Sequence, residues 1–282
     1  GVFLQLRLPR VLLCAITGAV LASSGVLMQG LFRNPIVEPG LVGTSAGAAF
    51  GASVVFVLAA GISPQIKSVA GPFLVPLFAF GGGLIATYIV YSFAKSAGKV
   101  SATSLLLVGV AINAVGLSGT GFMSYIARDP QARSITFWNL GTFSGASWLQ
   151  VAIVFTVSAI IFFISLRYSK QLNALLLGEE DAAYLGVDTD KLKRKIMLLN
   201  TAMVSVVTAF VGVISFVGLI VPHIIRLIIG SDNKKLLPAS MLGGAILLTV
   251  VDMAARLLLA PAEIPIGIIT SIAGAPVFII LL

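Results

Sequence analysis

Apolar stretches long enough to cross a lipid bilayer recur along the whole chain. A helix of roughly 17 to 25 residues spans a hydrocarbon core about 30 Å thick, and it satisfies its own backbone polar groups on the way. We therefore expect an all-α, polytopic membrane protein that forms a single transmembrane domain over residues 1–282. The nine predicted spans lie at about 9–31, 41–60, 72–94, 103–126, 148–166, 195–213, 216–230, 237–259 and 265–282.

The composition excludes a water-soluble fold. Hydrophobic residues make up 58% of the 282 residues and charged residues only 10%, whereas soluble domains carry about 25% charged residues. The net charge of +8 would suggest a nucleic-acid partner in a soluble protein. Here the basic residues lie in short loops between apolar runs, a pattern typical of membrane orientation, and we expect no nucleic-acid partner.

The distribution of Lys and Arg predicts the topology. If Arg33 is cytoplasmic and the spans alternate, twelve of the 18 basic residues fall inside and six outside, which agrees with the positive-inside rule. Residue 1 is then extracytoplasmic, so we expect one further N-terminal span, giving ten in the parent protein. The alternative is a nine-span protein with an exported N-terminus. The residues placed outside are Arg7, Arg10, Lys67, Arg128, Arg133 and Arg256.

The longest polar segment, residues 167–195, contains a predicted short helix between Gly178 and Gly186. Acidic residues fill its first turn, where the helix dipole favours negative charge. Leu177, Leu185 and Val187 can give it an apolar edge. The helix is either a contact site for a partner or an ordinary solvated loop.

Two arginines are predicted on the outer face, Arg7 before the first span and Arg256 at the end of the eighth. A guanidinium is suited to bind carboxylates, so these residues can dock an acidic partner. The alternative is that their side chains simply reach the lipid interface.

Two pairs of opposite charge are close in sequence. Asp252 and Arg256 are four residues apart and can pair on one helix face, which we favour over a proton relay. Arg33 and Glu38 can pair in the first loop, which either braces a gate or is a fixed turn.

The fourth span carries polar residues on an otherwise apolar helix, and these should face protein or water rather than lipid. The small residues around Gly116 either pack helices together or line a pore. The polar residues are Asn113, Ser118, Thr120 and Ser124.

No catalytic or metal-binding set is recognisable. Cys14 is the one cysteine and His223 the one histidine, and both are interpreted as structural residues. The chain has no GxxxxGK[ST] phosphate loop and no GxSxG motif, so we expect it neither to hydrolyse ATP itself nor to bind a cofactor.

Five ordered segments resemble the FecCD-type permeases, the membrane subunits of type II ABC importers for heme, ferric siderophores and cobalamin. The resemblance implies a homodimer of ten-span subunits in the bacterial inner membrane. It also implies two cytoplasmic ATPase subunits that carry ATP and Mg, and an extracytoplasmic binding protein. The segments are Leu6–Arg10, Met28–Pro35 with Glu38–Leu41, Leu177–Val187, Phe216–His223, and Glu263–Gly267 with Gly274–Phe278.

The resemblance also implies roles for particular residues. Arg7 and Arg256 would dock the binding protein, and the segment from Arg128 to Trp148 would form an outer gate. The path between the two subunits would be lined by Asn113, Gly116, Ser118 and Thr120. Contact with the ATPase, called coupling, would be made by Leu177, Gly178, Glu179, Glu180, Ala183, Leu185 and Gly186.

The expected activity is import of an iron chelate by alternating access. Met28–Asn34 and Leu107–Ala114 look most similar to heme permeases, with ferric-siderophore permeases next and cobalamin permeases third. The main rival from another class is an ion-coupled secondary transporter, but the acidic residues all fall in loops or at span ends, which counts against it. A channel or a membrane enzyme is less consistent with the sequence, which lacks a selectivity-filter segment and a catalytic set.

Overall fold

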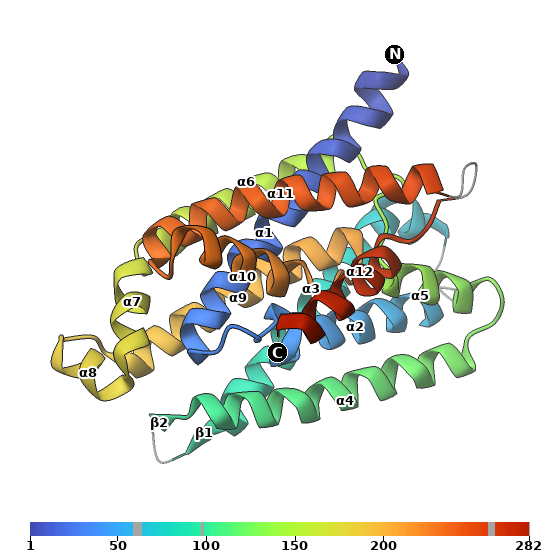
Figure 1. Cartoon of the computed structure of the whole chain (residues 1–282). Helices are drawn as coiled ribbons and strands as arrows, with labels where there is room; N and C mark the ends of the chain where they lie inside the picture. Colours follow the sequence, from blue (N-terminus) through green and yellow to red (C-terminus); the bar gives the residue numbers. More distant parts are fainter. Residues whose placement is uncertain (59–63, 97–98, 259–262, 282) are drawn as a thin grey trace. The chain divides into compact units, whose positions relative to one another are not determined.

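The computed structural model describes residues 1–58, 64–96, 99–258 and 263–281, and nearly all of them are helical (Figure 1). Two-residue strands, β1 (Lys95–Ser96) and β2 (Lys99–Val100), pair antiparallel between α3 and α4. A short π-helix, Phe3–Arg7, leads into α1, and a 3-10 turn, Pro39–Val42, precedes α2. The α-helices are α1 (Leu8–Phe32), α2 (Thr44–Leu58), α3 (Pro64–Ala94), α4 (Ala102–Ile126), α5 (Gln131–Asn139), α6 (Trp148–Leu166), α7 (Ser169–Leu177), α8 (Glu179–Tyr184), α9 (Thr189–Val211), α10 (Val217–Ile229), α11 (Asn233–Leu258) and α12 (Ile266–Leu281).

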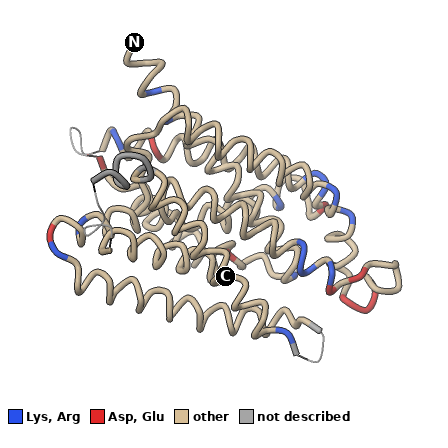
Figure 2. The backbone as a smooth tube through the Cα atoms, turned by 180° about the vertical axis from the view of Figure 1, so that it is seen from behind, with Lys and Arg blue, Asp and Glu red and all other residues tan. Residues whose placement is uncertain are grey.

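A helix of the structure lies at each of the nine predicted spans. Among the described residues, six helices are long and apolar enough to cross a membrane, and three shorter apolar helices, α2, α10 and α12, match the remaining predictions. Two boundaries differ: α3 begins at Pro64 rather than near 72, and α9 begins at Thr189 rather than near 195. At α9 the reason is that Lys and Arg are good helix formers although they lower the local hydropathy. Figure 2 shows acidic and basic residues near helix ends, with the long middle stretches uncharged.

The described chain divides into two compact units. Unit 1 comprises Gly1–Pro39, Phe143–Met203 and Ile214–Leu282, and unit 2 comprises Gly40–Thr142 and Val204–Val213. The long helix α9 contributes residues to both.

The core of unit 1 forms around α1, which packs against α6, α10 and α11 (Figure 1). Residues Val20–Phe32 of α1 are all buried, including the polar residues Ser24 and Gln29. The α1 and α11 backbones touch at Gly18 and Gly244, where a Cβ added to Gly18 would lie 2.0 Å from the Gly244 carbonyl oxygen. Only glycine allows this approach, as is typical of helix packing in lipid.

The turn after α1 corrects one sequence prediction. In the described part of the chain Glu38 forms no ion pair with Arg33; its Oε1 instead accepts a hydrogen bond from the Phe216 backbone N–H at 2.8 Å. Phe216 has a left-handed backbone (φ 68°) and begins α10. The carboxylate therefore satisfies one of the free N–H groups of a helix start, and burial raises the pKa of Glu38.

Unit 2 is built on α2, which packs against α3, α4 and α5. Its core is lined by small residues, Ala48, Ala52, Ala79 and Ala209, so the helices lie close together. A buried hydrogen bond of 2.9 Å joins the Thr44 and Thr87 hydroxyls between α2 and α3.

Candidate functional site

The predicted short helix of the polar segment is present as α8. Glycines with positive φ bound it, Gly178 at 133° and Gly186 at 83°. At its end the Gly186 N–H donates to the Ala183 carbonyl and the Val187 N–H to the Ala182 carbonyl. This is the Schellman arrangement, which needs a left-handed residue and so favours glycine. The local sequence therefore sets both ends of α8.

The tip of this segment exposes large apolar side chains. Leu177 and Leu185 are each 65% exposed, and Tyr184 is 89% exposed. Leu177 and Leu185 lie on the apolar edge predicted from the sequence, whereas Tyr184 was missed. Exposed apolar groups beside a charged turn mark a surface suited to bind another protein. We call Leu177, Tyr184 and Leu185 the α8 tip.

The acidic residues of α8 are not equivalent. Glu180 and Asp181 are exposed, whereas the Glu179 Oε2 lies 2.6 Å from the Nζ of Lys193 on α9. The Lys193 side chain is only 2% exposed. This pair has no signal in the sequence, because Lys193 stands among other basic residues in a polar segment and nothing local distinguishes it.

A second polar contact joins α7 to the start of α11. Asn173 donates to the Asp232 carboxylate at 2.7 Å, and its carbonyl oxygen accepts from the backbone and side-chain nitrogens of Asn233, each at 2.8 Å. The hydrogen bond from Asn173 holds the pKa of Asp232 below its usual value, helped by the Lys234 backbone N–H. The segment that carries the α8 tip is therefore held on both α9 and α11.

A charge cluster lies near the other end of α11. Asp252 is 2% exposed and accepts from Arg10 on α1 at 2.9 Å and from Arg256 at 3.2 Å. Arg10 also donates to Glu263 at 2.9 Å. The predicted Asp252 and Arg256 ion pair is confirmed. The sequence missed Arg10, which lies 242 positions away from Asp252.

The two predicted docking arginines have different surroundings. The Arg256 side chain is 34% exposed and held by Asp252, whereas Arg7 lies exposed in the turn that leads into α1. Arg256 can therefore present only part of its guanidinium to a partner.

The predicted path residues of α4 lie on two faces of the helix. Asn113 donates to the Leu41 carbonyl at 3.0 Å, and Thr120 donates to the Gly116 carbonyl at 2.9 Å. A Cβ on Gly116 would lie 3.0 Å from Ala46 of α2. These three residues thus lie on the α2 side of α4, while Ser118 lies on the exposed side.

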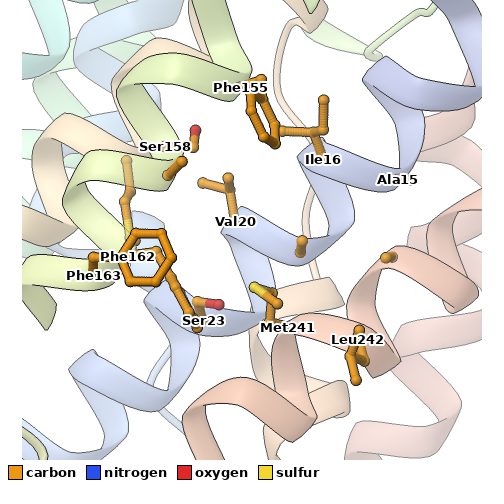
Figure 3. Close-up of a pocket in the computed structure, with 14 residues that line it drawn as sticks. Ala15, Ile16, Val20, Ser23, Phe155, Ser158, Phe162, Phe163, Met241 and Leu242 are labelled. Carbon is orange, nitrogen blue, oxygen red and sulfur yellow. The ribbon is translucent and has the colours of Figure 1, made fainter. Parts of the chain in front are cut away.

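Unit 1 also holds an apolar cavity of 360 Å³ (Figure 3). It is lined mainly by α1, α6 and α11, with Phe155, Phe162 and Val20 among the larger side chains. The hydroxyls of Ser23 and Ser158 have no partner in the described structure. The lining has no charged residue, so the cavity offers nothing that would bind an anionic ligand.

Among the residues that the structure describes, no group of three His, Cys, Asp or Glu side chains could hold a metal ion. Cys14 is buried and donates to the Leu248 carbonyl.

The comparisons with known proteins give the family. A profile of the FecCD transport family matches residues 1–282. The chain is 40% identical to the hemin transport system permease HmuU of Yersinia pestis, covering 99% of this chain and 82% of that one. It is also 40% identical to the cobalamin import permease BtuC of Halobacterium salinarum, covering 98% of this chain and 72% of the relative.

Solved structures agree with this result. One solved structure is described as an inward-facing conformation of a metal-chelate type ABC transporter. It matches with a TM-score of 0.89 and 34% identity, over 100% of this chain and 88% of that one. PsaBC of Streptococcus pneumoniae matches with a TM-score of 0.61 and 18% identity, over 96% and 89% of the two chains, and shares the fold. The chain belongs to the FecCD transport family and is a multi-pass membrane permease of the ABC importer type.

Proposed function

We propose that the chain is the permease subunit of an importer that moves heme across the bacterial inner membrane. It would act as a homodimer with two cytoplasmic ATPase subunits and an extracytoplasmic binding protein. The observation that carries the ATPase-driven part of this proposal is the α8 tip, with Tyr184 89% exposed on a helix that is held to α9 by the contact of Glu179 with Lys193. Such a surface suits the groove of an ATPase subunit, and the ATP and Mg would be held by that subunit.

The mechanism that fits this arrangement is alternating access. Closure of the ATPase dimer on ATP would push α8, and the spans attached to it would open one side of the path and close the other. No bond in the ligand is broken, so the chain needs no catalytic residue or cofactor of its own. The coupling set remains Leu177, Gly178, Glu179, Glu180, Ala183, Leu185 and Gly186, to which we add Tyr184.

The outer face would receive the binding protein. Exposed Arg7 can pair with a carboxylate of that partner. Arg256 would contribute the part of its guanidinium that Asp252 leaves accessible. The segment from Arg128 to Trp148, which contains α5, would act as the outer gate.

The path would run along the exposed side of α4. That side carries Leu107, Val115 and Ser118, a mainly apolar surface without charged residues, which suits a bulky ligand that is passed along rather than tightly held. Asn113, Gly116 and Thr120 would keep α4 packed on α2 and so set the width of the path.

Cobalamin is the second candidate, because the cobalamin permease of Halobacterium salinarum is as similar to the chain as the hemin permease. Ferric siderophores remain a third class of ligand. In such systems the binding protein contributes much of the selectivity, so the ligand is best settled by transport.

The test is uptake into proteoliposomes that contain the permease, its ATPase and its binding protein. Hemin, cyanocobalamin and ferrichrome are supplied separately, with and without ATP. ATP-dependent hemin uptake supports the proposal. Uptake of cyanocobalamin or ferrichrome instead would keep the importer and change the ligand, and uptake that persists without nucleotide under an ion gradient would favour a secondary transporter.

A further inference from the structure

Lys193 is a buried cation in a part of the chain where its neighbours are solvated. Arg194 and Lys195 are exposed, and the Lys191 side chain is 68% exposed. The Lys193 side chain is 2% exposed, and its Nζ lies 2.6 Å from the Glu179 carboxylate. Burying an ammonium is costly unless an anion lies beside it, so Lys193 and Glu179 depend on each other.

The pair joins a short helix to a long one. Helix α8 has six residues, too few to be stable alone, so its position depends on tertiary contacts. The glycines at its two ends allow the backbone to turn and give little stiffness. Two features that hold α8 within the unit are the fully buried side chain of Ala182 and the contact of the Glu179 carboxylate with Lys193.

Helix α9 can carry a displacement from α8 deep into the permease. It runs without a break for 23 residues from Thr189 to Val211. Near its middle, Asn200 hydrogen-bonds the Ser24 hydroxyl of α1 and the Pro39 carbonyl. Residues of α9 up to Met203 belong to unit 1, and so do Ser24 and Pro39.

We propose that Glu179 and Lys193 are positioning residues that transmit movement of α8 to α9. This inference rests on the proposed function, in which α8 contacts the ATPase. The inference assigns different roles to Glu179 and Glu180, two adjacent acidic residues with the same chemistry. Glu180 is exposed and can face the partner, whereas the Glu179 carboxylate contacts Lys193 of α9. Without the pair, α8 follows the ATPase while α9 does not follow α8.

The test measures hemin uptake and ATP hydrolysis together in the reconstituted importer, with cyanocobalamin as the second ligand. In Glu179→Gln and Lys193→Met we expect the ligand imported per ATP hydrolysed to fall about tenfold, within the usual range of coupling between sites. The ATPase should still co-purify with both variants. The matched control, Lys191→Met, removes an exposed lysine two positions before Lys193 on α9 and should keep the wild-type ratio of uptake to hydrolysis.

Exchanging the two charges of the Glu179–Lys193 pair distinguishes a loss of coupling from a loss of folding. The double variant Glu179→Lys with Lys193→Glu keeps one charge of each sign, and we expect it to recover a measurable part of the lost uptake per ATP. The inference is overturned if Glu179→Gln couples as well as wild type, or if Lys193→Met and Lys191→Met lose coupling equally. It is also overturned if Glu179→Gln loses its monodisperse elution in detergent, because the role is then structural. If the wild-type importer shows no ATP-dependent uptake at all, the proposed function itself fails.

Discussion

Asp252 of α11 binds Arg10 of α1, with 2.9 Å between the carboxylate Oδ1 and the guanidinium Nη2. The carboxylate is almost completely buried and also accepts from Arg256, so it lies between two cations. The same two helices meet at Gly18 and Gly244. The contact of α1 and α11 is therefore fixed by charge near one end and by backbone packing further along.

Loss of the Asp252 carboxylate should destabilise the permease strongly. In Asp252→Ala, Arg10 and Arg256 lose their shared partner in a mostly buried site, and we expect a cost of about 3 to 5 kcal/mol. Thermal unfolding in detergent measures it. The control is Glu263→Gln, because this carboxylate is 45% exposed and an exposed pair contributes about 0 to 1 kcal/mol. Equal losses in the two variants would contradict the arrangement.

Because α1 and α11 approach closely at Gly18, we expect one methyl group added there to destabilise the protein. In Gly18→Ala the added Cβ would meet the Gly244 backbone at 2.0 Å, so the helices must separate and the unfolding temperature should fall. Gly81→Ala is the matched control, because a Cβ there meets nothing within 4 Å, and replacing a helical glycine by alanine is worth up to about 1 kcal/mol. A stabilised Gly18→Ala variant would refute the predicted packing.

Because the α8 tip is exposed, we expect a substitution there to leave folding unchanged and to weaken binding of the ATPase subunit. In Tyr184→Ser we expect unchanged thermal stability, because the side chain is 89% exposed. Its affinity for the ATPase subunit should fall about tenfold or more, as is usual for a central aromatic contact. Co-purification and titration in detergent measure this. Normal ATPase binding by Tyr184→Ser would exclude Tyr184 from the interface.

The contact between Asp232 and Asn173 should depend on pH with a definite sign. The hydrogen bond lowers the pKa of Asp232 in the folded state below the ordinary value of 3.8. Its stabilisation is therefore fully present above the unfolded pKa and is lost as pH falls through the folded pKa. The difference in unfolding temperature between wild type and Asp232→Ala should stay constant from about pH 7 to 5 and shrink toward about pH 3. A difference that grows on acidification would contradict it.

Much of the fold could be predicted because its signals are local. Each span needs a continuous apolar stretch of fixed length, so the nine predicted spans agree with the helices of the structure. The ends of α8 were predictable for a similar reason, since Gly178 and Gly186 occupy positions whose positive φ favours glycine. The Asp252 and Arg256 pair followed from helical spacing alone.

Contacts between distant residues were not predictable. Glu38 pairs with the Phe216 N–H rather than with nearby Arg33, and Arg10 reaches Asp252 from a different helix. Likewise Lys193, one of several basic residues in a row, is the one whose side chain is buried against Glu179.

The sequence by itself determined which segments are helical and apolar and which family the chain resembles. The tertiary structure decided which charges are paired and which face a partner. The physical reason is that hydropathy and backbone preference depend on neighbours in sequence, whereas burial of a charged side chain depends on the helix packed against it.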